Sequence, residues 1–339
     1  MRYCVNCDRE TQVGFKYCPH CGKPLLIDNL DISLLNLTEK PVFMKKGTSG
    51  TKETEGEYVL FGDWPQTIKE KWVDINTSVT YNFNGQVCYK GSDGAFYIKL
   101  NCTPHEFWDD KDICPSSFSN GQELKDGKDY YFKIEPIKWR ILSHKYNGGI
   151  LLLAENVLAN AEDFYCYLEN NRVINNKTIN PNNYEYSNIR AYLNGFNNKE
   201  YKGEDFSNIG FLNNAFTSKA QELINTTSLQ EFDNVNDKVF ILNKKDLTNT
   251  FFGFTYSSEN SPERKRQFTD YAKGNGVYAE PVEGYEKHTD WWIRDAIENT
   301  TTLCYTVNNS GAIVLDNAND VCITLVGVVP AIVISSKNS

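Results

Sequence analysis

Short apolar runs, separated by clusters of Asn, Gly, Ser and Asp, recur along the chain and predict β-strands. Residues 137–142 and 150–154 are two such runs, and the sequence Tyr-Asn-Gly-Gly at 146–149 lies between them. Asn-Gly favours the tight turn of a β-hairpin, so the two runs predict paired antiparallel strands. Further strands are predicted at 58–62, ending in a turn at 63–66; at 130–134, interrupted by Pro136; at 238–242 and 291–294; at 303–307 and 312–315, around a turn at 308–311; and at 327–334, the last strand, which is buried.

Helical features are confined to a few short segments. Residues 188–196 follow Ser187, a favoured N-cap residue, and carry apolar residues at helical spacing. Two further segments are predicted, a helix at 218–224 capped by Thr217 or Ser218 and a helical turn at 246–250. Short strands mixed with a few short helices, without regular alternation of strand and helix, predict an α+β fold.

Two Cys-x-x-Cys pairs stand near the start of the chain, Cys4 with Cys7 and Cys18 with Cys21. Two thiolates at this spacing reach one ion from a tight turn, and two such turns complete the tetrahedral set that zinc prefers. Residues 1–25 therefore resemble a short zinc ribbon with one structural Zn²⁺ ion. Because so small a module has little core, the metal is expected to drive its folding.

The rest of the chain divides into two predicted parts. Residues 26–56 include a polar, glycine-bearing stretch at 45–52 and are predicted to be a linker. Residues 57–339 have dispersed apolar runs and no internal repeat, so they are predicted to form one α+β domain.

Charge narrows the range of partners, because 35 Lys and Arg residues face 44 Asp and Glu residues, a net charge of −9. Nucleic-acid binding needs clustered basic residues, so no nucleic-acid partner is expected. The tight basic run Arg264-Lys265-Arg266 is predicted to be a solvated loop. No segment has the roughly 20 continuous apolar residues of a membrane span, and the start of the chain lacks the apolar core of a signal peptide. We therefore expect a cytoplasmic protein without a membrane span.

Seven phrases are spread along the chain. They are Leu-Phe-Gly-Asp-Trp-Pro-Gln at 60–66, Gly-Ser-Asp-Gly at 91–94, Phe-Lys-Ile-Glu-Pro-Ile-Lys-Trp-Arg-Ile-Leu at 132–142, Tyr-Ser-Asn-Ile-Arg-Ala-Tyr-Leu-Asn at 186–194, Thr-Asp-Tyr-Ala at 269–272, Trp-Trp-Ile-Arg at 291–294 and Gly-Val-Val-Pro-Ala at 327–331. Together they resemble an uncharacterised bacterial domain family that is often found behind an N-terminal zinc ribbon. The resemblance covers nearly all of 57–335.

The last two phrases, with the predicted hairpin between them, resemble the end of C-type-lectin-like domains. This fold also serves formylglycine-generating enzymes and the variable proteins of diversity-generating retroelements. The resemblance implies a rigid frame that presents the polar stretch 296–322 as a binding surface, with Arg294 at a strand end tied to Glu135 or Asp295. The candidate ligand-binding residues are Tyr305, Asn308, Asn309, Asp316, Asn317, Asn319 and Asp320. Alternatively, these are ordinary turn residues of a solvent-facing hairpin.

These features favour a non-catalytic module that binds a protein or a small molecule, of the kind seen in retroelement variable proteins. One alternative is an enzyme of formylglycine-generating architecture, which would bring Cys304, Cys322 or His288 together in a pocket. His288, Thr289 and Asp290 are expected to form a local hydrogen-bonded turn. The other alternative is an adaptor whose zinc ribbon binds the partner. Six cysteines have no predicted role: Cys88, Cys102, Cys114, Cys166, Cys304 and Cys322.

Overall fold

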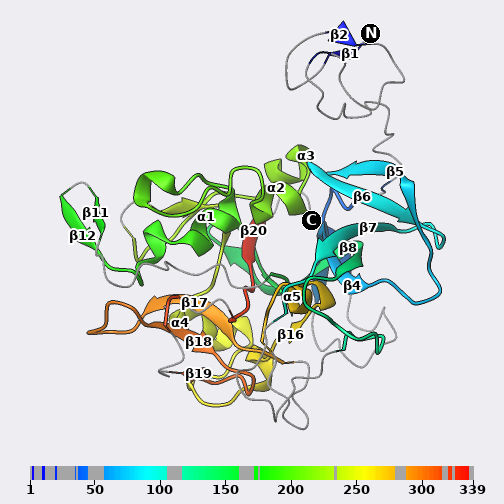
Figure 1. The fold of residues 1–339 in the computed structure, drawn as a ribbon. Helices are drawn as coiled ribbons and strands as arrows, with labels where there is room; N and C mark the ends of the chain where they lie inside the picture. Colours follow the sequence, from blue (N-terminus) through cyan, green and yellow to red (C-terminus); the bar gives the residue numbers. More distant parts are fainter. Residues whose placement is uncertain are drawn as a thin grey trace. The chain divides into compact units, whose positions relative to one another are not determined.

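The computed structural model describes residues 2–3, 10–11, 20, 35, 37–44, 57–104, 117–159, 172–174, 176–232, 235–278, 288–314, 320–322 and 325–335 (Figure 1). Contacts divide the chain into two units, Met1–Asn36 and Leu37–Ser339. In the first unit, strands β1 (Arg2–Tyr3) and β2 (Glu10–Thr11) form an antiparallel pair. The four predicted zinc ligands, Cys4, Cys7, Cys18 and Cys21, lie outside the described residues.

The larger unit is built on a nine-stranded sheet in which all the strand pairs are antiparallel. The strands follow the order β15–β20–β9–β8–β7–β6–β5, and β4 pairs with β8 and β3. Their bounds are β3 (Val42–Met44), β4 (Tyr58–Ile68), β5 (Ile75–Phe83), β6 (Gln86–Gly91), β7 (Phe96–Asn101), β8 (Asp129–Tyr146), β9 (Gly149–Ala154), β15 (Val239–Phe240) and β20 (Ala331–Ser335). Strand β3 thus lies inside the segment predicted to be a linker.

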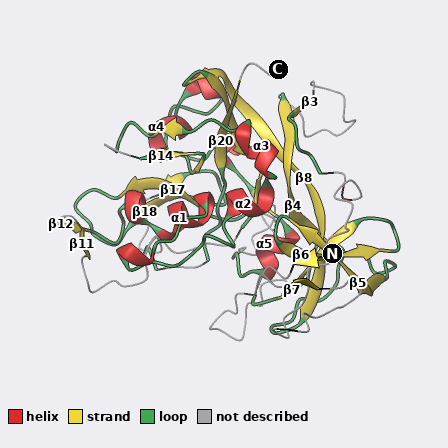
Figure 2. Ribbon diagram, turned by 90° about the horizontal axis from the view of Figure 1, so that it is seen from above, coloured by secondary structure: helices red, strands yellow, loops and turns green. Residues whose placement is uncertain are grey.

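Short elements complete the unit. Among its described residues, three two-stranded pairs are present: β10 (Asn156–Val157) with β16 (Gln267–Phe268), β11 (Arg172–Ile174) with β12 (Lys177–Ile179), and β13 (Thr227–Ser228) with β14 (Asn236–Asp237). A separate three-stranded sheet consists of β17 (Trp291–Ala296), β18 (Cys304–Val307) and β19 (Ile313–Val314). Helices α1 (Asn188–Asn194) and α4 (Lys244–Leu247) lie on the same side of the unit as β17 and β18, whereas α2 (Phe211–Ala215) packs against β4 (Figures 1 and 2). The predicted α+β class, mostly antiparallel sheet with a few short helices, is confirmed.

The predicted hairpin at 137–154 is confirmed. Tyr146 of β8 pairs with Gly149 of β9, which leaves Asn147 and Gly148 as a two-residue turn. Both turn residues have positive φ, 48° and 79°, as the primed hairpin turns require. The second hairpin is also present, since Val307 of β18 pairs with Ile313 of β19.

Several predicted strand ends are wrong, and the last strand, β20, begins at Ala331 and not at residue 327. Strand β4 continues through the predicted turn at 63–66, because a bulge between Leu60 and Asp63 shifts its register against β8. Gly62 adopts φ 69° at this bulge, and a side chain there would press on the ring of Phe216. Strand β8 continues through Pro136. On the edge of β8 that faces β7 and β9, Pro136 lies between the stretch paired with β7 and the stretch paired with β9. Its missing N–H therefore costs no ladder hydrogen bond on this edge.

The helices predicted at 188–196 and 218–224 form with small changes of length. The helical turn predicted at 246–250 is wrong, because α4 (Lys244–Leu247) ends at the second of these residues and the 3-10 turn η4 (Thr250–Phe252) begins at the last. Helix α1 (Asn188–Asn194) starts at Ser187, whose hydroxyl accepts from the Arg190 amide at 3.1 Å, and it ends at Gly195 with φ 69°. Helix α3 (Ser218–Glu222) is capped by Thr217. The remaining helices are α2 (Phe211–Ala215), α4 (Lys244–Leu247), α5 (Asp270–Gly274) and the 3-10 turns η2 (Tyr184–Tyr186), η3 (Lys199–Tyr201), η4 (Thr250–Phe252) and η5 (Pro262–Arg264).

Three tryptophans mark the core of the larger unit. Trp139 of β8 and Trp291 and Trp292 of β17 are fully buried in one apolar cluster with β9 and β20. The indole N–H of Trp139 donates to the Phe61 carbonyl at 2.7 Å, which satisfies a polar group that burial would otherwise penalise. The expectation that the Trp-Trp strand and the final strand bury a large apolar area is therefore confirmed, although β17 belongs to its own sheet.

The basic run is not the solvated loop that was predicted, because Arg264 and Arg266 are 0 % and 3 % exposed. Arg264 donates to the carbonyls of Gly311 at 2.7 Å and Leu247 at 3.1 Å. Its planar group of donors joins three chain segments that are distant in sequence. These arginines are part of the frame and do not form a basic surface.

Candidate functional site

The predicted ligand-binding residues are only partly brought together. Tyr305 is half-buried on β18, with the Lys244 ammonium 4.8 Å from its ring centre. The Asn308 side-chain oxygen accepts from the Ser310 and Ala312 amides at 3.1 and 2.9 Å, so this side chain stabilises its own turn. Asp316, Asn317 and Asn319 lie outside the described residues.

The carboxylates of Asp290 and Asp320 also hold local backbone in place. The Asn309 amide donates to the Asp290 carboxylate at 2.9 Å, and Asp320 accepts from the Cys322 amide at 3.0 Å. These contacts agree with the alternative in which the polar residues of this stretch build turns. The prediction that they bind a ligand stays a prediction.

The cysteines of the enzymatic alternative are poorly placed for catalysis. Cys304 is fully buried, and burial raises the pKa of its thiol well above the ordinary value, whereas a nucleophilic cysteine reacts as the thiolate. Cys304 and Cys322 are both free thiols, and the strand register pairs Leu303 with Asp320. Cysteines 304 and 322 therefore do not face each other across paired strands.

Arg294 forms ion pairs other than those predicted. Its guanidinium binds Glu231 and Asp246, the latter at 3.2 Å, and it also donates to the Ile241 carbonyl. Glu135 accepts instead from the Thr67 hydroxyl at 2.6 Å, and Asp295 from the Lys244 amide at 2.7 Å. The predicted ties of Arg294 to Glu135 or Asp295 are wrong because Glu231 and α4 supply its partners.

An acidic pocket of about 510 Å³ lies beside this arginine, between the turn at 296–300 and the segment at 178–184. Its lining combines carboxylates, amides and aromatic rings: Asn180, Asn182, Asn183, Tyr184, Glu231, Phe232, Arg294, Asp295, Glu298, Asn299 and Thr300. Only the 296–300 side of this pocket belongs to the polar stretch 296–322 that was predicted from the sequence to be a binding surface.

Negative charge is in excess at the acidic pocket. Arg294 lies close to the carboxylates of Glu231, Asp246 and Asp295, and Glu298 adds an exposed carboxylate to the lining. Burial raises the pKa values of the Asp246 and Asp295 carboxyls because a buried carboxylate loses its hydration. One arginine therefore balances only part of the charge.

The acidic pocket offers acceptors in its carboxylates and in one amide oxygen. The Asn183 side-chain oxygen is buried and has no hydrogen-bond partner among the described residues. The amide nitrogen of Asn182, a possible donor, is already bonded to the carbonyls of Thr300 and Leu303 at 3.2 and 3.1 Å. The pocket therefore suits a ligand group that donates hydrogen bonds and carries positive charge.

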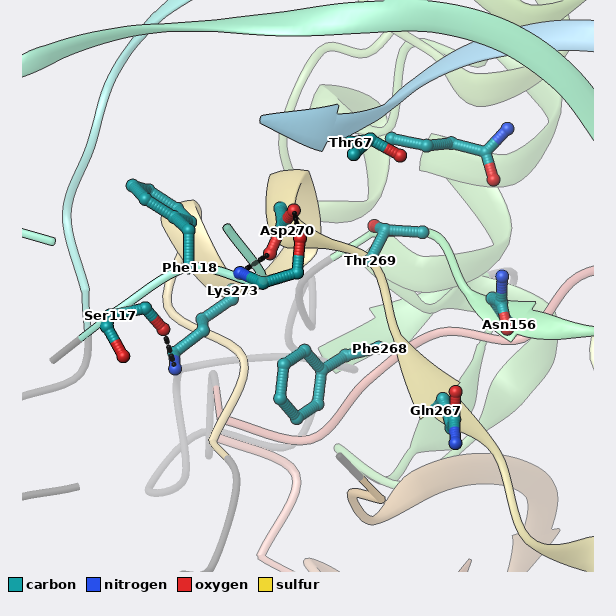
Figure 3. Close-up of a pocket in the computed structure, with 11 residues that line it drawn as sticks. Thr67, Ser117, Phe118, Asn156, Gln267, Phe268, Thr269, Asp270 and Lys273 are labelled. Atoms are coloured by element: carbon teal, nitrogen blue, oxygen red, sulfur yellow. Dashed lines mark hydrogen bonds between the residues drawn. The ribbon is translucent and has the colours of Figure 1, made fainter. Parts of the chain in front are cut away.

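A second pocket, the amide pocket, has a volume of about 360 Å³ (Figure 3). The end of β4, the Ser117–Ser119 turn, the parallel β10–β16 pair and α5 supply its walls. Its lining side chains carry amides, hydroxyls and two phenyl rings beside one charge of each sign: Gln66, Thr67, Ser117, Phe118, Ser119, Asn156, Gln267, Phe268, Thr269, Asp270 and Lys273.

The two charged residues of the amide pocket tie its walls together. The Asp270 carboxylate accepts from the Ser119 amide at 2.8 Å, the Ser119 hydroxyl at 2.5 Å and the Ile68 amide at 3.1 Å. The Lys273 ammonium donates to the Ser117 carbonyl at 2.7 Å (Figure 3). Helix α5 is thereby fixed to β4 and to the Ser117–Ser119 turn.

A domain of unknown function (DUF6273) matches residues 147–336, and the chain belongs to this family. The predicted resemblance to an uncharacterised domain family is supported over this range, while its extension to residue 57 stays a prediction. No curated protein and no solved structure matches the chain. The acidic pocket lies wholly within the matched residues, whereas the amide pocket also uses 66–67 and 117–119.

One predicted absence can be compared with the structure. Within the described ranges, no helix is both long and apolar enough to cross a bilayer.

Proposed function

We propose that this protein is a non-catalytic binding protein whose acidic pocket takes a cationic nitrogen group, an ammonium or a guanidinium, from a partner protein or a small molecule. The observation that carries the proposal is that the carboxylates of Glu231, Asp295 and Glu298 line the pocket with one arginine, beside the side-chain oxygen of Asn183, which is unbonded among the described residues. Ammonium and guanidinium groups only donate hydrogen bonds, so they match carboxylate and amide oxygens. The half-buried ring of Phe232 offers apolar surface to the carbon chain of such a ligand.

The test compares two ligands of the same shape. Butylguanidinium carries the charge, and butylurea replaces it with a neutral group. Isothermal titration of the full chain should give saturable binding of butylguanidinium and at least about tenfold weaker binding of butylurea, since hydrogen bonds to charged groups are the stronger ones. Equal binding of both ligands, or no binding of either, would overturn the proposal.

Asp295→Asn is the informative variant, because the amide keeps an oxygen for the Lys244 N–H while removing the charge. We expect it to weaken butylguanidinium binding about tenfold, and Glu298→Gln about threefold because Glu298 is exposed. Glu222→Gln removes one exposed carboxylate outside the pocket and is the matched control, expected to leave the affinity unchanged. An equal loss in all three variants would indicate only a general charge effect.

We also propose that Cys4, Cys7, Cys18 and Cys21 hold one structural zinc ion, as their spacing supports. Metal analysis of the purified chain should then find about one zinc per chain, and Cys4→Ser should remove it. Removal of residues 1–25 should leave butylguanidinium binding intact. Loss of binding in that truncated chain would favour the adaptor in which the zinc ribbon binds the partner.

A further inference from the structure

The amide pocket differs from the acidic pocket in having no net charge to offer a ligand. Asp270 already accepts three hydrogen bonds from the walls, and Lys273 donates to Ser117 and lies 5.7 Å from the ring centre of Phe268. One carboxylate and one ammonium balance each other, and both are anchored to the frame. Neither an anion nor a cation would gain from entering.

The groups that remain available both donate and accept. Asn156 and Gln267 are register partners in the parallel β10–β16 pair, which sets their side chains next to each other at the pocket. In Figure 3, no hydrogen bond joins their amides or the hydroxyl of Ser117 to another residue drawn at the pocket. In Figure 3, Asn156 and Gln267 stand on the side of the pocket away from Ser117.

Gln66 adds a fixed acceptor to this set. Its amide nitrogen donates to the carbonyls of Glu135 and Pro136, both at 3.1 Å. These bonds determine the orientation of the amide and leave its oxygen for a ligand. The half-buried ring of Phe268 supplies an apolar surface between the polar groups.

From this arrangement we infer that the amide pocket binds a neutral polyol of about the size of one sugar ring. A hydroxyl group both donates and accepts, so it satisfies amides and serine hydroxyls in either direction. Adjacent hydroxyls on one ring match the adjacent amides of Asn156 and Gln267, and the C–H face of the ring fits against Phe268. A volume of about 360 Å³ is within the range of small-molecule sites.

The experiment titrates the full chain with glucose, galactose and mannose, one at a time, followed by ligand-observed NMR. Tetrahydropyran-2-methanol has the ring with one hydroxyl, and uracil is a planar donor–acceptor ligand without a sugar ring. We expect saturable binding of at least one hexose and at least about tenfold weaker binding of both comparison ligands. Binding of uracil without hexose binding, or no hexose binding at all, would overturn the inference.

Variants then locate the bound hexose. Gln267→Ala removes an exposed side chain without a partner in the described part of the chain, so folding should be unaffected, and we expect about tenfold weaker binding. Ser117→Ala should weaken it about threefold, since one hydroxyl is lost. Gln230→Ala removes an exposed glutamine outside the pocket and should change nothing. Hexose affinity that survives both pocket variants would place the sugar elsewhere and contradict the inference. This result is independent of butylguanidinium binding.

Discussion

The acidic pocket and the amide pocket are comparable in volume, about 510 and 360 Å³, and both are rich in amides. They differ in how their charges are used. In the acidic pocket, Arg294 pairs with two carboxylates, Glu231 and Asp246, and the side-chain oxygen of Asn183 is an unbonded acceptor within the described part of the chain. In the amide pocket, Asp270 and Lys273 are one of each sign and are bonded to the walls. Because the pockets are similar in size and residue type, charge balance is the difference on which the two proposed ligand classes depend.

The pockets also differ in what supports their walls. The acidic pocket depends on one buried guanidinium that joins Glu231, α4 and β17. The amide pocket depends on one carboxylate that collects three hydrogen bonds from β4 and the Ser117–Ser119 turn. Removing either residue should therefore destabilise the unit, but to different degrees.

Arg294→Leu should have the largest effect. Loss of the guanidinium leaves the buried Asp246 carboxylate without its cation, and breaking such a buried pair costs about 3–5 kcal/mol, while the more exposed pair with Glu231 adds less. Urea unfolding followed by fluorescence measures the change in the free energy of unfolding. Lys99→Ala, which breaks the exposed pair with Asp129, is the control and should cost less than about 1 kcal/mol. A loss of only that size at Arg294 would mean that the buried network does not support the acidic pocket.

Asp270→Asn should have a smaller effect on stability. The amide retains one acceptor oxygen but replaces the other with a donor that faces the Ser119 or Ile68 N–H, at a cost of about 1–3 kcal/mol. The same unfolding measurement applies, and hexose binding should weaken with it. An unchanged free energy of unfolding would show that α5 is held by other contacts.

The pH dependence of butylguanidinium binding should be the smallest of the three effects, and it should have a defined direction. Burial raises the pKa of the Asp295 carboxyl above the ordinary value of about 3.9, so this residue takes up a proton at higher pH than an exposed aspartate. A cation binds the ionised form. The affinity should therefore be full above the raised pKa and fall as pH decreases through it.

Titrations between pH 7 and pH 4.5 measure this dependence. Asp295→Asn should flatten the pH profile, and hexose binding should stay constant in the wild-type chain over the upper part of this range. A butylguanidinium affinity that is independent of pH, or that rises on acidification, would contradict the role given to Asp295.

The local features of the fold were predictable from the sequence. The Asn147-Gly148 turn and the Ser187 cap are specified by residues next to one another, and both form as predicted. The prediction that Pro136 interrupts the strand was wrong because the effect of a proline depends on which strands lie beside it. The neighbours of β8 at this position are a property of the whole sheet. The residues next to Pro136 in the sequence do not determine which strands pair with β8 there.

Most of the pocket residues were not predicted from the sequence, because they come together only through contacts between distant segments. The acidic pocket joins residues near 180, 231 and 295, and the amide pocket joins residues near 66, 118, 156 and 270. The burial of Arg264 and Arg266 likewise depends on carbonyls from distant segments. Periodicity and motif spacing report local structure, whereas these sites are made by contacts across the whole unit.

Hydrogen–deuterium exchange of the full chain, with and without each ligand, tests most directly whether the two pockets recognise different chemistry. Butylguanidinium should slow amide exchange in peptides covering 294–300 and leave those covering 267–273 unchanged. The bound hexose should do the reverse. Protection of the same peptides by both ligands, or of neither region by either, would contradict the account.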